Sequence, residues 1–327
     1  MTQPNSTTQS SPSSGCDPSF TAGSVTLVLD APQQSLATQP LPANFRTMQK
    51  IPNISGAAAS GSAEFSLSQF QAMLATIGQK AGGFPLAVVD LRQEPHGSLV
   101  LEQPLNSETE IAVGWFAERD WLNVAKGLPS ILVDEQNRLA SASQTTDLIV
   151  YDVLTKIATE DGICTATPYT VNPTGSYRSE ETLVQAFANV GYLRLPTTDH
   201  CRPRDSEVDH FVAYEATLDP RTWLHFHCRA GDGRTTSFMV MHDIIHNAPG
   251  DSLATILTRQ GPSGIGGIDL ASLPKNQAIF SYPFSVERVG FIQDFYTYVC
   301  DAKAGGFKLK WSDWVLQKIA QKQSLAA

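Results

Sequence analysis

Short apolar runs alternate with stretches of helical periodicity along most of the chain. Residues 84–91 form a nearly continuous apolar run, FPLAVVDL, which is typical of a parallel strand buried on both faces. Residues 66–80 carry apolar side chains at helical spacing, after a serine and before two glycines, so they predict a helix. Because such strands and helices alternate, the pattern predicts an α/β layered fold.

The same patterns delimit the other elements. Strands are expected at residues 24–30, 192–195 and 223–228, and helices near 146–160 and at 179–191, 205–218, 235–247, 286–302 and 311–325. The helix at 179–191 has the clearest ends, because Ser179 is a good N-cap and Gly191 is a typical terminator. The rest of 98–175 is expected to form short β-prone segments and turns.

Composition and charge narrow the function. A hydrophobic share of 42% of 327 residues is enough for a sizeable core and excludes a wholly disordered chain. The 23 Lys and Arg against 32 Asp and Glu give a net charge of −9, which argues against a nucleic-acid binder with a broad basic surface. A small basic pocket stays compatible with this balance, because the local field matters more there than net charge.

The sequence indicates neither a membrane span nor a secretion signal. No stretch approaches about 18 consecutive apolar residues, and the first fifteen residues contain eight Ser or Thr and no charge. We expect residues 1–23 to be a disordered tail. Bacterial effectors often begin in this way, as do flexible cytosolic proteins. The expected location is therefore the cytoplasm, or outside the cell after export by a non-classical, effector-type route.

The cysteines do not suggest a disulfide framework or a paired-cysteine zinc site. They are odd in number and widely scattered, at Cys16, Cys164, Cys201, Cys228 and Cys300. A reducing compartment is therefore the default expectation.

One short segment carries the chemistry. Residues 227–236, HCRAGDGRTT, lie between an apolar strand and a predicted helix. Glycines let backbone N–H groups point into a bowl, and the helix N-terminus favours an anion there. Cys228 at this position is expected to form a thiolate readily, and Arg234 can grip two phosphate oxygens. A buried structural cysteine, a sulfur-transfer loop and an arsenate-reducing loop are alternatives. The preceding His227 and the GxGRTT ending make the last two less favourable.

The segment resembles the phosphate-binding loop of the protein tyrosine phosphatase superfamily, and more specifically that of bacterial cysteine phytases, the tyrosine-phosphatase-like inositol polyphosphatases. Further matching segments occur in that family's order: LPANFRT (41–47), VVDLRQEPHG (88–97), RDWLN (119–123), RLPTTDH (194–200), RQ…IGG (259–267) and FIQDFYTYV (291–299). The resemblance implies one domain over 24–327 with a central, largely parallel sheet flanked by helices. It also implies a small β-rich, partial-barrel subdomain from about 98–177 together with 40–50.

The resemblance assigns roles to individual residues. Asp199, in the TDH motif, matches the general acid, which protonates the leaving alkoxide and then activates water. His200 would contact a substrate phosphate. The loop supplies Cys228 as nucleophile, Arg234 as phosphate clamp, Thr235 and His227 to tune the thiolate, and Arg229, Ala230, Gly231, Asp232 and Gly233 as the cradle. Within that cradle Arg229 is expected at the rim, and Asp232 is expected to point away or to pair with Arg229.

An inositol polyphosphate needs further cations for its non-reacting phosphates. The resemblance points to Arg46, and to Asp120 as a residue that positions a basic partner or the substrate. Arg178 is the nearest candidate for a lysine that the family carries between 170 and 180. Lys275 and Tyr282 are candidates for a pair that closes over the ligand.

The implied function is stepwise hydrolysis of phosphate monoesters of myo-inositol polyphosphates through a phosphocysteine, with no metal or other cofactor. The expected partner is this small-molecule substrate, with no nucleic acid and no obligate protein partner. A protein tyrosine phosphatase, a phosphoinositide phosphatase and a non-catalytic binding module for phosphorylated ligands remain alternatives.

Two other signals carry less weight. His242 and His246 are four residues apart, as in HExxH, but zinc needs an open cleft and a third ligand, and the neighbouring side chains look core-facing. We therefore expect no metal there. Cys201 lies beside the predicted acid, and a reversible disulfide with Cys228 is a hypothesis that peptide mapping after mild oxidation can test.

Overall fold

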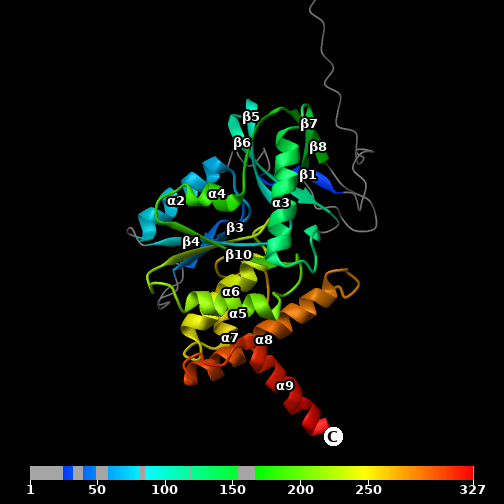
Figure 1. Ribbon diagram of the computed structural model, residues 1–327. Helices are drawn as coiled ribbons and strands as arrows, with labels where there is room; N and C mark the ends of the chain where they lie inside the picture. Colours follow the sequence, from blue (N-terminus) through cyan, green and yellow to red (C-terminus); the bar gives the residue numbers. More distant parts are fainter. Residues whose placement is uncertain are drawn as a thin grey trace, which may run out of the picture.

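The computed structural model describes residues 25–31, 40–48, 58–81, 85–117, 120–153 and 166–326 (Figure 1). The tail predicted at 1–23 lies outside these residues. The described chain forms two sheets with helices around them, which confirms the predicted α/β fold. No helix within these ranges is long and apolar enough to span a bilayer.

The central sheet has five strands in the order β10 (Val190–Thr197), β4 (Leu86–Arg92), β11 (Trp223–His227), β3 (Ala59–Ser62) and β2 (Arg46–Thr47). The first four are parallel, and β2 is antiparallel to β3. Every residue of β4 and β11 is buried, as the apolar run at 84–91 predicts for a strand covered on both faces.

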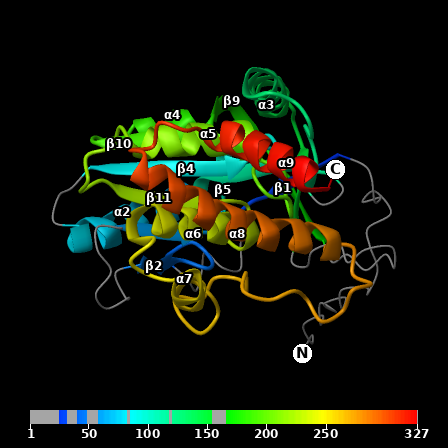
Figure 2. The ribbon, with the colours of Figure 1, turned by 90° about the horizontal axis from the view of Figure 1, so that it is seen from below.

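Eight helices accompany the sheets among the described residues. They are α2 (Leu67–Ala81), α3 (Leu128–Ser143), α4 (Glu180–Gln185), α5 (Asp205–Glu215), α6 (Gly233–Asn247), α7 (Leu253–Gln260), α8 (Tyr282–Ala304) and α9 (Trp311–Ala326). Helices α2 and α4 cover one face of the central sheet, and α5 and α6 cover the other (Figure 1). Helices α8 and α9 pack on α5 and α6 from the side away from the sheet (Figures 1 and 2).

The second sheet has six strands in the order β8 (Ala166–Val171), β7 (Leu148–Val153), β1 (Thr26–Leu29), β6 (Glu108–Phe116), β5 (His96–Leu105) and β9 (Pro173–Arg178). All neighbours are antiparallel except β1 and β7. Helix α3 packs on it through Leu139, in a core shared with Leu99 and Val113.

The strands between 98 and 177 therefore gather in one sheet, but the expectation that 40–50 joins them is wrong for the described residues 40–48. Arg46 and Thr47 form β2, which pairs with Gly61 and Ser60 of the central sheet. The second sheet recruits β1 instead. The division of the chain into domains stays a prediction.

Two helix predictions also need correction. The helix expected near 146–160 is instead strand β7 in its described part, because LIVYDV is rich in β-branched and aromatic residues. The actual helix, α3, lies earlier. Its buried stripe includes the polar Glu135, which interrupts the apolar periodicity.

Helix α4 is shorter than the predicted 179–191. Ser179 caps it as predicted, because its side chain accepts a hydrogen bond from the Thr182 backbone N–H. The chain then turns through Asn189, which has a positive φ of 61°. Gly191 does not end the helix but lies in β10, beside Ala87 of β4.

Candidate active site

The predicted phosphate loop runs from the end of β11 into α6. Gly231 adopts a positive φ of 73°, and a Cβ there would lie 2.3 Å from the Ala63 backbone nitrogen. Only glycine therefore fits this close approach to the chain after β3. The Glu64 N–H donates to the Arg229 carbonyl at 3.1 Å, which ties the two segments together.

The Cys228 thiol lies at the base of this loop. Cys228 is only 2% exposed, and the Thr235 hydroxyl donates to its sulfur at 3.2 Å. The guanidiniums of Arg46, Arg234 and Arg288 all interact electrostatically with Cys228. Positive charge thus surrounds the sulfur from three separate elements, β2, α6 and α8.

Arg234 is held rigidly by a carboxylate that the sequence analysis did not single out. Its Nη1 and Nη2 donate to the two oxygens of Glu94 at 2.8 and 2.9 Å, and Nη1 also donates to the Thr197 carbonyl at 3.1 Å. Burial alone would raise the pKa of Glu94, but Arg234 and Arg92 hold it well below its usual range. The buried Nε of Arg234 keeps no hydrogen-bond partner among the described residues, so it is available to an anion in the loop.

Asp199 lies next to this arginine, in the turn after β10. One of its carboxylate oxygens is 3.6 Å from Arg234 Nε, and the other is 3.2 Å from His200 Nε2. The Trp121 indole donates to the Asp199 carbonyl at 3.0 Å and fixes the turn. The structure therefore brings the predicted acid, His200 and the clamp arginine together.

Arg46 and Asn44 stabilise the loop through hydrogen bonds to its backbone and side chains. Arg46 donates to the Gly231 carbonyl at 2.7 Å and to the Thr236 hydroxyl at 3.0 Å. The Asn44 amide donates to the Ala230 carbonyl at 2.8 Å and to the Asp232 carboxylate at 3.2 Å. Asp232 thus bonds to Asn44, and not to Arg229 as one alternative predicted.

The sequence analysis expects Arg229 at the rim of the loop, and this expectation is wrong. Its guanidinium turns toward the second sheet, where it contacts Asp30 at 3.1 Å and Asp120 at 3.2 Å and lies 4.8 Å from the centre of the Phe116 ring. Burial raises the pKa of Asp120 to about 6, although Arg229 opposes the rise. Of the two roles expected for Asp120, this geometry favours positioning a basic partner.

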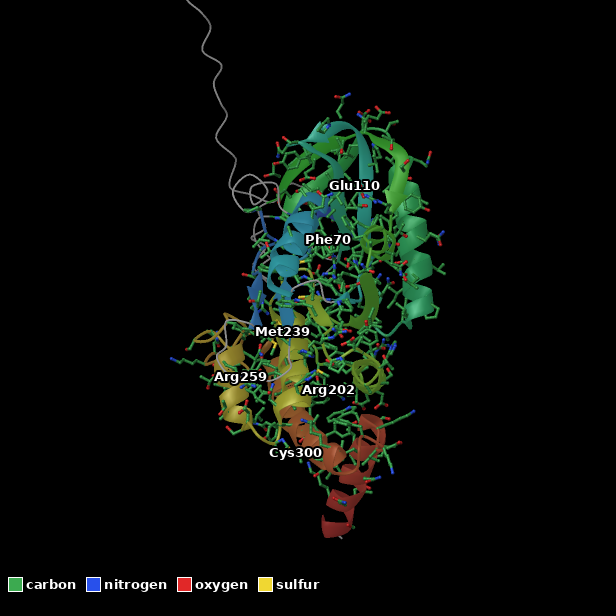
Figure 3. All side chains as sticks on the ribbon, turned by 90° about the vertical axis from the view of Figure 1, so that its left-hand side faces the viewer. Phe70, Glu110, Arg202, Met239, Arg259 and Cys300 are labelled. Atoms are coloured by element: carbon green, nitrogen blue, oxygen red, sulfur yellow. The ribbon has the colours of Figure 1, made fainter. Side chains whose placement is uncertain are left out.

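Three peripheral candidates lie apart from these contacts. Arg178 in β9 forms an ion pair with Glu110 of β6, and Glu110 is well separated from Met239 of α6 in Figure 3. Lys275 is exposed in the segment between α7 and α8, and Tyr282 begins α8. Their contacts with a ligand stay predictions.

Arg288 is a further basic residue that sequence reasoning missed. It lies in α8 and is 6% exposed, and its Nη2 donates to the Cys201 carbonyl at 3.4 Å. A Cβ on Gly233 would lie 2.8 Å from Nη1, so the guanidinium covers the start of α6. Nothing local marks this arginine, because an arginine beside a glutamate in a helix usually faces solvent.

Glu180 is another residue that the sequence analysis did not single out. It is buried, and its carboxylate lies 2.8 Å from His227 Nε2, while Glu64 lies 3.5 Å from Nδ1. Burial would lower the pKa of His227, but the two carboxylates outweigh it and raise the pKa to about 9. His227 is therefore a buried cation directly before Cys228.

The comparisons agree with this geometry. Residues 89–246 match the family model of the PTP-like phytases, whose description reads "Inositol hexakisphosphate". A PTP-like phytase from Bdellovibrio bacteriovorus is 32% identical, covers 90% of this chain and 96% of its own, and superposes with a TM-score of 0.67.

Two further relatives are longer than this chain. The PTP-like myo-inositol phosphatase of Mitsuokella multacida, solved with myo-inositol-(1,3,4,5)-tetrakisphosphate, is 32% identical over 90% of this chain and has a TM-score of 0.73. The effector protein hopD2 of Pseudomonas syringae is 28% identical over 71% of this chain. The chain spans 49% and 46% of their lengths. Because the match to the Bdellovibrio protein covers nearly all of both chains, the chain belongs to the family of PTP-like phytases.

Proposed function

We propose that the chain is a cysteine phosphatase that removes phosphate groups stepwise from myo-inositol polyphosphates. The observation that carries the proposal is the environment of Cys228. A buried thiol accepts a hydrogen bond from Thr235 and interacts electrostatically with the guanidiniums of Arg46, Arg234 and Arg288. The Asp199 carboxylate lies beside Arg234.

In the proposed reaction, the Cys228 thiolate attacks phosphorus and the bond from phosphorus to the leaving alkoxide breaks. Asp199 gives its proton to that alkoxide. A water molecule then attacks the phosphocysteine, its proton passes to the Asp199 carboxylate, and the sulfur leaves as a thiolate. The Thr235 hydroxyl stabilises this departing sulfur. Arg234 holds the equatorial phosphoryl oxygens through both steps, so the route uses no metal ion.

The proposed substrate class rests on the excess of cations. One phosphoryl group needs one clamp, and Arg234 supplies it, while Arg46 and Arg288 add positive charge at the base and at the α8 side of the loop. An inositol carrying several phosphates makes use of such additional charge. The inositol tetrakisphosphate complex of the Mitsuokella relative supports the same class.

The test is phosphate release from inositol hexakisphosphate at mildly acidic pH with EDTA present. We expect Cys228→Ser to abolish turnover while ligand binding persists. Cys300→Ser is the matched control. Cys300 lies on α8, and Figure 3 shows it well separated from Met239 of α6, the helix that follows the phosphate loop. The Cys300→Ser protein should retain activity.

Other outcomes separate the alternatives. Activity on phosphotyrosine peptides or inositol lipids but not on inositol hexakisphosphate would keep the mechanism and replace the substrate. Binding of all three ligands without Cys228-dependent turnover would favour a non-catalytic module.

We also propose that the protein acts after export as an effector. The uncharged Ser/Thr-rich start and the relation to hopD2 support this. A translocation assay in which deletion of residues 1–20 leaves export unchanged would contradict the role proposed for the tail.

A further inference from the structure

A cluster of one carboxylate and two imidazoles lies away from the phosphate loop, toward the far end of α6. His242 and His246 are one helical turn apart on α6, and their ring centres are 4.5 Å apart. Glu215, the last residue of α5, approaches both. Its Oε1 is 2.5 Å from His242 Nδ1, and its Oε2 is 3.5 Å from His246 Nε2.

This cluster supplies the third ligand that the sequence alone did not reveal. The HDIIH motif offers two imidazoles at the spacing used by zinc-binding helices. Glu215 lies more than twenty residues earlier in the chain, so only the packing of α5 on α6 brings it to them. One ligand atom from each of the three residues lies within 4.8 Å of the other two.

The geometry suits a small tetrahedral cation. Two ligands at about 2.0–2.1 Å from zinc lie about 3.3 Å apart, close to the 3.5 Å between Glu215 and His246. That contact is not a hydrogen bond, because the buried Nε2 of His246 has no such partner among the described residues. At His242 the ion would replace the present short hydrogen bond, which requires a small rotation of the Glu215 carboxylate.

Burial and exposure also fit a bound ion. The side chains of Glu215 and His242 are 6% and 3% exposed, so they would hold the cation out of bulk water. The His246 ring is 28% exposed, but its Nε2 atom is buried beside Glu215. At the end of α6 the Lys303 ammonium donates to the carbonyls of His246 and Ala248.

Two other carboxylate and histidine clusters, around His227 and His96, do not qualify in the same way. Both lie among buried arginines, and their carboxylates already neutralise Arg92 and Arg194. Among the described residues, Glu215 forms its ion pairs with His242 and His246 and none with an arginine or lysine. The negative charge of Glu215 is therefore available to the two imidazoles and to a cation bound by them.

We propose that Glu215, His242 and His246 form a site for a zinc-like divalent cation that fastens α5 to α6. Helix α5 begins just after the turn that holds Asp199, and α6 begins at Gly233, one residue before Arg234. A cation here would lock together the two helices that follow the acid turn and the phosphate loop. The role is structural and independent of the proposed hydrolysis.

Zinc binding tests the proposal directly. The full-length Cys228→Ser protein, freed of metal with EDTA, removes the competing thiolate of the loop. We expect it to retain about one zinc ion per chain after dialysis against micromolar zinc chloride, and to melt a few degrees higher with zinc. Cobalt bound in its place should give the visible absorption of a tetrahedral site.

Three variants in the same background make the test specific. Glu215→Gln keeps an acceptor for His242, and His246→Ala removes a half-exposed ring, so both should fold. Each should bind zinc about 10-fold more weakly or worse and lose the zinc-dependent rise in melting temperature. His210→Ala, an exposed histidine of α5, should behave like its parent. The proposal is wrong if the parent retains no stoichiometric zinc, or if both ligand variants retain as much as it does.

Discussion

Glu180 provides the sharpest test of how the fold supports the phosphate loop. Its carboxylate lies 2.8 Å from His227, and both side chains are fully enclosed. The perturbation is Glu180→Gln, which keeps the size of the side chain and removes its charge. His227 then loses its nearest counter-charge while it remains buried.

The magnitude follows from the pKa of His227, which the surrounding carboxylates raise from 6.5 to about 9 against the effect of burial. At about 1.36 kcal/mol for each pKa unit, this difference contributes about 3 kcal/mol to the free energy of unfolding. Because the pKa is raised in the folded state, the contribution is complete below pH 6.5 and disappears as the pH rises through 9. Glu180 makes the largest of the contributions that raise this pKa, ahead of Glu64 and Asp90. Glu180→Gln should therefore cost up to about 3 kcal/mol at pH 6.5 and much less above pH 9.

Urea denaturation from pH 6 to pH 9.5 measures this difference. Glu181→Gln is the matched control, because Glu181 is the next residue of the same helix and is exposed. It should change stability by only a few tenths of a kcal/mol at every pH. An equal cost of Glu180→Gln at pH 6.5 and pH 9.5, or a cost no larger than that of Glu181→Gln, would refute the reasoning.

Three further predictions concern the loop and its acid. Glu94→Gln should lower kcat/KM on inositol hexakisphosphate by about 10²-fold, because Arg234 loses the carboxylate that orients its guanidinium; steady-state kinetics measure this. Gly231→Ala should destabilise the fold by more than about 3 kcal/mol in thermal unfolding, since its Cβ would meet backbone atoms at 2.3 Å. Gly266 also has a positive φ, but a Cβ there would meet open space, so Gly266→Ala should lower the free energy of unfolding much less. Asp199→Asn should slow hydrolysis of inositol phosphates by about 10²–10⁴-fold but slow p-nitrophenyl phosphate far less, because that leaving group does not need a proton; equal losses would count against the acid role.

The parts of the site that sequence predicted are those coded by neighbouring residues. The loop at 227–236 combines a strand end, glycines and a helix start within ten residues, so its shape follows from local rules. Asp199 lies 29 residues before Cys228, and its predicted role comes from the resemblance of its TDH motif to the family. In the fold, β10 and β11 both pair with β4. The order of parallel strands then brings their carboxyl ends to one edge of the sheet.

The parts that sequence did not predict depend on long-range packing. Arg288 reaches Cys228 only because α8 crosses the start of α6, 60 positions along the chain. Glu180 has the composition of an ordinary first-turn acid, and only the burial of α4 against the central sheet turns it toward His227. The placement of β2 is of the same kind, because a two-residue strand has no periodicity to detect.

The arginines around Cys228 differ in one respect that has a measurable consequence. Arg234 is neutralised by Glu94, whereas Arg46 and Arg288 donate hydrogen bonds to carbonyl and hydroxyl oxygens of the described residues. Burial lowers the pKa of both these guanidiniums. Asp232 opposes this effect at Arg46 and Asp199 opposes it at Arg288, but neither carboxylate is hydrogen-bonded to the arginine. The pocket is therefore positive although the whole chain carries −9.

A bound phosphate should offset the cost of burying these charges, so phosphate binding should raise the free energy of unfolding. Inorganic phosphate at about 100 times its dissociation constant should stabilise the Cys228→Ser protein by about 2.7 kcal/mol. Arg288→Met should reduce this gain at the same phosphate concentration and leave the ligand-free protein about as stable as before, because an apolar side chain replaces a buried charge whose hydrogen bond is to a carbonyl and not to a carboxylate. Arg138→Met, on the surface of α3, should keep the full gain. Thermal unfolding with and without phosphate decides the matter. If Arg288→Met unfolds several kcal/mol more easily without ligand and still gains fully from phosphate, then Arg288 is a structural residue, and the positive charge of the pocket has another source.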